Sequence, residues 1–334
     1  HRRLVLVAIA ACSAPAPAPV PPSTGALDVP PPGLRLPDGA TPLAYDLRLE
    51  VDPASDAFVG HVAIRVRLDA PADHLWISAD KLAVTSARWD GGALERMRGA
   101  GDQMIAFGFG RRVGPGELTL AFDYTGETTH DEEGLFHQQQ GGRWYLFSQG
   151  EARLARGIAP CFDEPRWKTP WHVTLDVPAG ETALANMPVA AERALPDGRR
   201  EIAFAETPPI PSYLVAIAVG PFAMVDVGAL GRGKIPVRVA ALAGHAEDVG
   251  VVAQRLPAVI DGLETYLDDA LPWPKLDLVV VPRLFGAMEN PGLVTFAAEI
   301  IAGDPRSREF SAQFVRVAAH ELAHFWFGDL VTPA

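Results

Sequence analysis

Apolar and polar side chains alternate with a period of two through much of residues 33–222. One such stretch places Tyr45, Leu47, Leu49 and Val51 on the same side of an extended chain. Successive side chains of a strand point to opposite faces of a sheet, so this period predicts strands with one buried face. The pattern recurs in residues 62–68, 118–124 and 173–177. We therefore expect an all-β sandwich or saddle over residues 33–222.

Two segments of this region do not alternate. Tyr213–Val219 is a continuous apolar run, which predicts a strand that is buried on both faces. Ser148–Pro165 is instead rich in carboxylates, with Glu151, Asp163 and Glu164 among them. Charged loops are usually hydrated, so the residues alone favour a solvated turn for this segment.

The hydrophobic period changes in residues 223–334. Apolar residues recur at helical spacing from Ala246 to Leu267, with a kink or interruption expected near Pro257. A strand is predicted at Leu278–Val281, and a final helix carries Phe310, Phe314, Val317 and Phe325 toward the core. Strands followed by helices predict an α+β lobe behind the β domain.

The final helix contains His320-Glu321-Leu322-Ala323-His324, the pattern H-E-x-x-H. Residues four apart share a helix face, so both imidazoles can reach one metal ion. Glu321 lies beside that face, where it can act as a base toward water. Zinc suits such a donor set best. The alternative is a solvated helix that happens to carry two histidines.

A second motif, Gly286-Ala287-Met288-Glu289-Asn290, precedes the final helix. Glycine beside small and amide residues is typical of a strand edge that a ligand backbone approaches closely. Such an edge can pair with an extended peptide, whose positive N-terminus Glu289 could then face. The alternative is a plain turn.

The first residues are expected to be a targeting segment. The basic residues His1 to Arg3 precede a short apolar core, and Cys12 follows small residues as in a bacterial lipoprotein cleavage box. We expect residues 1–12 to be the signal, Cys12 to be lipidated, and the Pro/Ala-rich residues 13–32 to be a linker. An ordinary cleaved signal peptide is the alternative. Export to the bacterial envelope follows, as an outer-membrane lipoprotein or in the periplasm.

The net charge of −12 argues against a nucleic-acid partner or an anionic membrane surface. The length of 334 residues suits about two domains. Only two cysteines are present, so no disulfide framework is expected.

With both motifs in hand, the chain resembles the aminopeptidase N family of zinc metallopeptidases, of the gluzincin clan. The pair GAMEN and HExxH is highly specific. The flank HFWFGDLVT (His324–Thr332) is similar to the family's HQWFGNLVT. Further matches are SQGE at Ser148–Glu151, PCFDEP at Pro160–Pro165 and NMP at Asn186–Pro188. The resemblance implies a thermolysin-like catalytic domain, incomplete here, over residues 223–334.

The resemblance also implies a role for each matching residue. His320 and His324 would bind one Zn²⁺, and Glu321 would be the general base. Glu289 and Glu151 would bind the free α-amine of a peptide, because a buried ammonium needs opposite charge to offset its desolvation. The remaining substrate-binding positions would be Gln149 in the first side-chain pocket, Gly286 and Ala287 against the substrate backbone, and Met288 and Asn290 within the same motif.

Departures from the family pattern bear on this reading. The family's third zinc ligand, a Glu, would fall beyond Ala334, and its transition-state Tyr further still, so we expect a fragment of a longer enzyme. Phe325, Pro291 and Gly150 each replace the family's usual residue, and Pro291 affects expectations about fine specificity.

The expected function is a zinc aminopeptidase that releases the N-terminal residue of peptides. The alternative is a cell-surface peptide-binding module that kept the fold and lost catalysis. A zinc endopeptidase is a third reading, against which the GAMEN motif argues.

Overall fold

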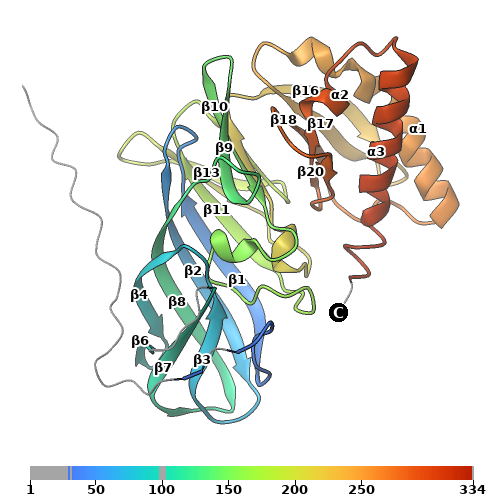
Figure 1. Cartoon of the computed structure of the whole chain (residues 1–334). Helices are drawn as coiled ribbons and strands as arrows, with labels where there is room; N and C mark the ends of the chain where they lie inside the picture. Colours follow the sequence, from blue (N-terminus) through green and yellow to red (C-terminus); the bar gives the residue numbers. More distant parts are fainter. Residues whose placement is uncertain (1–28, 31, 98–102, 333–334) are drawn as a thin grey trace, which may run out of the picture.

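A computed structural model describes residues 29, 30, 32–97 and 103–332 of the chain. An eight-stranded sheet forms the body of the first part (Figure 1). Its strands, in spatial order, are β13 (Val189–Ala194), β14 (Arg200–Phe204), β11 (Trp171–Val177), β1 (Ala40–Glu50), β2 (Ala57–Leu68), β8 (Gly116–Glu127), β4 (Ala83–Trp89) and β5 (Gly92–Ala93). Only the β1–β11 pair is parallel among these ladders.

The predicted alternation is confirmed in this sheet. Leu47 on β1 lies opposite Val62 on β2 and Val173 on β11, and Val62 in turn lies opposite Phe122 on β8. All four side chains are buried. Each contributes roughly 1.5–3 kcal/mol by leaving water. Because a one-residue slip would turn this whole row to solvent, the burial also fixes the register.

Two smaller sheets complete the β region. One contains β3 (Ala72–Ser78), β7 (Met104–Val113) and β6 (Glu95–Arg96). The other contains β12 (Thr182–Ala185), β15 (Ile217–Gly220), β10 (Arg143–Gln149) and β9 (Gly134–Gln140). Two short 3₁₀ helices, η1 (Ala155–Gly157) and η2 (Ser212–Leu214), lie in the connections.

The apolar run Tyr213–Val219 is not one strand, contrary to the sequence prediction. Its first residues belong to η2, and β15 begins only at Ile217. The side chain of Asn186 explains the difference. Its Nδ2 donates to the carbonyl of Leu214 at 2.8 Å, and its Oδ1 accepts from the amide of Ala216 at 2.8 Å. The Asn186 side chain thus pairs the backbone groups of Leu214 and Ala216, which in a continuous strand would pair with a neighbouring strand.

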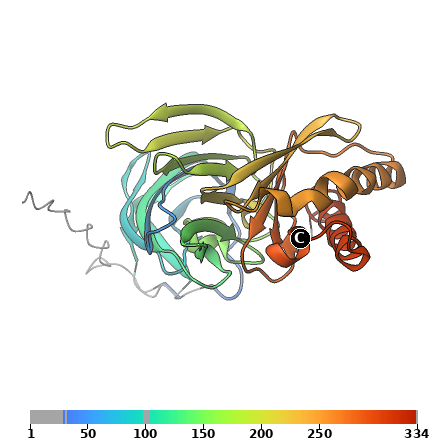
Figure 2. The same cartoon turned by 90° about the horizontal axis from the view of Figure 1, so that it is seen from above.

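The second part is a five-stranded sheet with helices. In spatial order the strands are β16 (Ala223–Leu230), β17 (Ile235–Ala241), β18 (Leu276–Val281), β20 (Leu293–Ala297) and β19 (Ala287–Met288). The helices are η3 (Ala246–Val249), α1 (Gly250–Leu267), α2 (Ala298–Ile301) and α3 (Arg308–His324). Figures 1 and 2 show α1 and α3 side by side, on the side of this sheet away from the β region.

Helix α1 runs through Pro257 without a break, so the predicted interruption is wrong. A proline inside a helix costs about 3 kcal/mol, because it removes a hydrogen bond and crowds the preceding turn. Leu256, Val259 and Ile260 around it are all buried, and their packing offsets that cost. The helix ends where Asp268 adopts a left-handed conformation, with φ of 52°.

The predicted fold class is confirmed: a mostly β region with several sheets precedes a short α/β region. The boundary between residues 222 and 223 stays a prediction. Among the described residues, no helix has the length and apolar character needed to span a membrane. The expected signal, Cys12 and nearly all of the linker lie outside the described residues.

Candidate active site

Two histidines of α3 point their rings at a common space. Nε2 of His320 lies 3.2 Å from Nε2 of His324, and the two ring planes are perpendicular. The i, i+4 spacing places both on one face of the final helical turns, as predicted. Ser307 caps the start of this helix, its side chain accepting from the amide of Phe310.

The backbone after α3 selects the tautomer of His324. Nδ1 of His324 donates to the carbonyl oxygen of Phe327 at 3.1 Å. A carbonyl can only accept, so the proton sits on Nδ1 and the lone pair on Nε2. That lone pair faces His320. Metal-binding histidines are commonly oriented in this way by a carbonyl on the other nitrogen.

The donor set fits zinc. Two imidazoles bound at 2.0–2.1 Å in a tetrahedral site would hold their nitrogens about 3.3–3.4 Å apart. The observed Nε2–Nε2 distance of 3.2 Å matches this value closely. Among the described residues, no third His, Cys, Asp or Glu joins these two histidines in a metal-binding group.

Glu321 directly follows His320 on α3 and is buried. Only 5% of the residue is exposed. Burial raises the pKa of its carboxyl to about 8, and the nearby carboxylates of Glu289 and Glu151 add to the rise. A cation beside it would reverse this effect and favour the ionised form, which is the form a general base needs.

Glu289 follows β19, the edge strand of the five-stranded sheet. Its Oε1 lies 3.9 Å from Nδ1 of His324, and the residue is buried. The motif therefore lies at a sheet edge, as the sequence predicts, and is not a plain turn. Among the strands of the described residues, β19 pairs only with β20, so its other side can accept an extended chain.

The neighbouring motif residues shape this edge. Gly286 has φ of 82°, in the left-handed region that favours glycine, and its carbonyl accepts from Ala297. Met288 and Asn290 are both buried. Nδ2 of Asn290 has no hydrogen-bond partner among the described residues. An unpaired buried amide is costly, so a polar partner at this position would stabilise it.

Glu151 comes to the same space from the β region. It follows Gln149, whose Oε1 accepts from the Glu151 amide at 3.4 Å. Glu151 is an exposed residue, yet partial burial of its carboxyl raises its pKa. The charge of Glu289 raises the pKa further, while His324 lowers it. Glu151, Glu289 and Glu321, from three separate segments, therefore form one acidic cluster beside the histidines.

The predicted solvated turn holds only for Glu151 to Arg153, which are exposed, and is wrong for the carboxylates Asp163 and Glu164, which are buried. Asp163 is buried and accepts from Arg156 Nε at 2.9 Å and from Ser212 Oγ at 2.6 Å. The Arg156 side chain is also buried. A paired, hydrogen-bonded charge can be buried where a free one cannot. This network joins the loop that follows Glu151 to η2, through Arg156, Asp163 and Ser212.

The Asn186 side chain also links the two parts of the molecule. Besides Leu214 and Ala216, it donates to the carbonyl of Pro291 at 3.0 Å. Pro291 directly follows the GAMEN motif. A Cβ on Gly292 would lie 2.2 Å from the Asn186 carbonyl oxygen, so the two segments are in close backbone contact.

Sequence reasoning missed two polar groups here. Asp329 is buried, and neither of its carboxyl oxygens has a hydrogen-bond partner among the described residues. Burial and then the charge of Glu289 raise its pKa to about 9, against a lowering effect of Lys168. Burial followed by the charge of Glu289 also raises the pKa of Tyr213. The only signal for either was its place within, or near, a motif.

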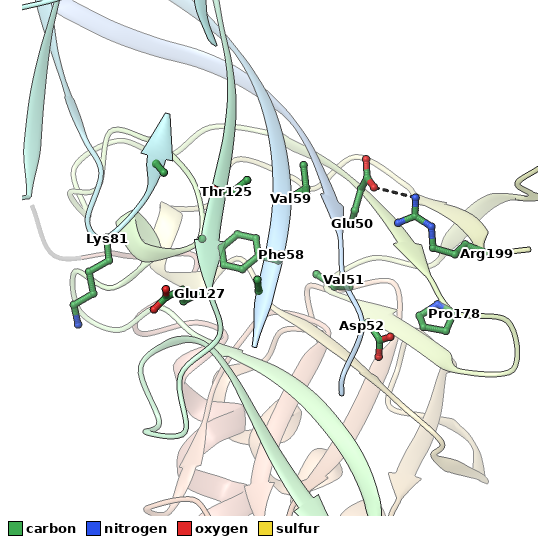
Figure 3. Close-up of a pocket in the computed structure, with 13 residues that line it drawn as sticks. Glu50, Val51, Asp52, Phe58, Val59, Lys81, Thr125, Glu127, Pro178 and Arg199 are labelled. Carbon is green, nitrogen blue, oxygen red and sulfur yellow. Dashed lines mark ion pairs between the residues drawn. The ribbon is translucent and has the colours of Figure 1, made fainter. Parts of the chain in front are cut away.

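A large hollow on the surface lies away from these residues. It holds about 750 Å³ and lies at one end of the eight-stranded sheet (Figure 3). Phe58, Thr125 and Lys81 line it, and Arg199 pairs with Glu50 at its rim at 2.9 Å. It contains none of the predicted site residues, so volume alone does not mark the chemistry.

A mixed fold that sets a two-histidine, one-glutamate helix beside a sheet edge is an arrangement typical of the metallopeptidase class of protein. Residues 41–214 match the Peptidase M1 N-terminal domain, and residues 253–334 match the Peptidase family M1 domain. The chain belongs to the Peptidase M1 family.

The chain is also similar to aminopeptidases from plants and animals. The chain is 37% identical over 308 residues to Aminopeptidase M1-B of Oryza sativa subsp. japonica. It is 34% identical over 313 residues to the puromycin-sensitive aminopeptidase of Caenorhabditis elegans. It is 29% identical over 328 residues to human glutamyl aminopeptidase. Each match covers 89% of this chain but only 33–35% of the relative, so the chain spans about a third of their length.

Proposed function

We propose that this chain carries the substrate-amine and metal-binding part of a zinc aminopeptidase, which releases the N-terminal residue from peptides. The single observation behind this proposal is the acidic cluster. Beside the two histidines, burial and then the charge of Glu289 raise the pKa of Glu151 and of Glu321. Such crowding favours cations, and the two cations of an aminopeptidase site are the metal and the substrate ammonium.

His320 and His324 would hold the zinc through their Nε2 atoms. When bound, zinc would act as a Lewis acid toward the scissile carbonyl and make water more acidic. Glu321 would accept the proton from the attacking water and pass it to the leaving amine. Its burial keeps bulk water away from that proton transfer.

Glu289 and Glu151 would bind the α-ammonium of the substrate from two sides. A peptide whose first residue is fixed there presents its first peptide bond, and no later one, to Glu321. The open edge of β19 at Ala287 would hydrogen-bond the substrate backbone. An endopeptidase would have no use for carboxylates at this position, because an internal peptide bond carries no charge.

The test is peptide binding to the zinc-loaded chain. A peptide amide with a free N-terminus is expected to bind roughly tenfold or more tightly than its acetylated form, because acetylation removes the charge that faces Glu289. The contrast should shrink in Glu289→Gln. Equal binding of the two peptides would remove the basis for the Glu289 and Glu151 roles.

A non-catalytic peptide-binding module is the second candidate. The observation in its favour is that, within the described residues, no third His, Cys, Asp or Glu joins His320 and His324 as a ligand. Metal content separates the two. Tight zinc at these histidines supports the enzyme, and zinc that leaves in dilute chelator supports the binder.

We also propose export and lipid attachment at Cys12, on the sequence of the first residues alone. In a bacterial host the protein should partition with membranes, and Cys12→Ser should release it. Mass spectrometry of the N-terminal peptide gives a direct readout of the lipid.

A further inference from the structure

Three metal-ligand side chains outside the active site lie together on the β region. Asp56 is in the turn between β1 and β2, His130 is in the loop between β8 and β9, and His137 is on β9. One ligand atom from each lies within 4.8 Å of the other two. The three residues do not form a local sequence motif, so the sequence alone does not predict that they lie together.

Backbone hydrogen bonds fix these segments relative to one another. The amide of Thr128 donates to the carbonyl of Asp56 at 3.0 Å. The amide of His137 donates to the carbonyl of Thr129 at 2.9 Å. The chain therefore holds all three positions close together before any ligand arrives.

The His137 ring is locked in place. Its side chain has no exposed surface, and its ring packs against the rings of His130 and Trp144, with centroids 4.7 and 4.6 Å away. Its Nδ1 donates to the carbonyl of Pro53 at 2.9 Å. Since a carbonyl only accepts, a neutral His137 carries its lone pair on Nε2.

That lone pair has no hydrogen-bond partner among the described residues. Nε2 of His137 is buried, and Oδ1 of Asp56 lies 3.3 Å from it. A lone pair and a carboxylate oxygen are both hydrogen-bond acceptors, so neither can satisfy the other. A cation between them would satisfy both.

We propose that Asp56, His130 and His137 form a second metal site, which binds a divalent transition-metal ion of the zinc type. Two imidazoles and one carboxylate are a donor set that zinc favours. His137 is the fixed ligand. Asp56 and His130 are exposed residues, and small rotations of their side chains would close the remaining distances to the ion.

This site would be structural. The ion would tie the β1–β2 turn to the β8–β9 loop at the surface. In that loop Glu132, two residues after His130, accepts from the amide of Phe285 at 2.8 Å. Phe285 directly precedes the GAMEN motif, so an ordered loop would also steady the approach to β19.

The simplest competitor is a His137 that is protonated on both nitrogens and paired with Asp56 without any metal. In that case Nε2 keeps its proton when zinc is added. In the proposed site the metal takes the place of any proton on Nε2, and that proton is released to the solvent. Nitrogen-15 NMR of labelled histidine separates these states directly, because the two forms have distinct Nε2 shifts.

The experiment uses the full chain with His320→Ala and His324→Ala, so that zinc at α3 does not contribute. Zinc is titrated against a chromophoric chelator. One equivalent should bind, and Asp56→Asn and His130→Asn should each weaken it by roughly tenfold or more. Both positions are exposed, so neither variant should disturb folding.

The matched control is His172→Asn, an exposed histidine whose Nδ1 lies 3.3 Å from Asp46. It should leave zinc affinity unchanged. The proposal is overturned if the chain lacking the α3 histidines binds no zinc, if Asp56→Asn and His130→Asn bind as tightly as their parent, or if Nε2 of His137 stays protonated in excess zinc.

Discussion

Nε2 of His320 lies 3.2 Å from Nε2 of His324, and the latter ring is turned by the carbonyl of Phe327. Two nitrogens this close repel unless a proton or a metal ion lies between them. The geometry thus presents a prepared pair of ligands at the end of α3.

Removing either histidine should abolish the zinc of this site. In a chain with Asp56→Asn and His130→Asn, we expect one zinc that is lost in His324→Ala. Chelator competition measures the affinity. His245→Ala is the control, since His245 is exposed and pairs with Asp248 at 2.8 Å. Unchanged binding in His324→Ala would contradict the assignment.

Glu321→Gln should separate metal binding from turnover. In any form of this protein that hydrolyses an aminoacyl anilide, we expect kcat to fall by roughly 10²–10⁴-fold, the usual contribution of a general base. Zinc content should stay the same, because the amide keeps the shape of the side chain. Retained turnover with normal zinc would rule out the base.

The metal-free chain should lose stability as pH rises. Folding raises the pKa of Glu321 from 4.5 to about 8, so the folded state binds more protons than the unfolded state between those values. The stability from this group is fully present below pH 4.5 and is lost as pH rises through about 8.

Urea unfolding at pH 5 and pH 9 measures the effect. Glu321→Gln removes this titration, so its gain in midpoint over the parent chain should be larger at pH 9 than at pH 5. Glu206→Gln, at an exposed position, serves as the control. An equal gain at both pH values would show that the buried carboxyl does not titrate in this range.

The Arg156–Asp163 pair should be a major source of stability. Arg156→Met leaves a buried, unpaired Asp163, which costs about 3–5 kcal/mol in comparable cases. Denaturant unfolding followed by tryptophan fluorescence measures the loss. Arg67→Met, at an exposed pair with Asp69, should have little effect. Similar losses from the two variants would show that burial is not the cause.

Asn186→Ala should weaken the join between the two parts of the chain. The change removes hydrogen bonds to Leu214, Ala216 and Pro291, and each polar group left unpaired costs about 1–3 kcal/mol. Hydrogen exchange should rise at the amides around β15 and β20. Asp197→Ala, at an exposed turn, is a suitable control. Equal amide exchange around β15 and β20 in the two variants would argue against this role of Asn186.

Sequence periodicity was sufficient for the sheets but not for the polar interior. Leu47 and Val62 were predictable because alternation is a local property of each strand. The burial of Asp163 was not, because its partner Ser212 lies far away in the chain. The break in Tyr213–Val219 likewise depends on Asn186, which no local pattern connects to it.

In the candidate active site, too, some residues could be predicted from the sequence and others could not. His320 and His324 are four apart on one helix, so their convergence follows from helix geometry alone. Glu151 and Glu289 were paired only through family resemblance, since nothing in their own segments brings them together. Asp329 had only its place within a motif as a signal, and the cluster of Asp56, His130 and His137 had none, because the significance of both lies in burial and distance.

The hydrogen bond from Asn186 to Pro291 has a consequence for how this chain can be recombined. Asn186 joins the turn before β15 to the segment that follows β19, although β15 and β19 belong to different sheets. A chimera that exchanges one lobe with a relative would preserve the placement of Glu289 only if both sides of this contact moved together. We therefore expect a working hybrid to take Asn186 and Pro291 from the same parent.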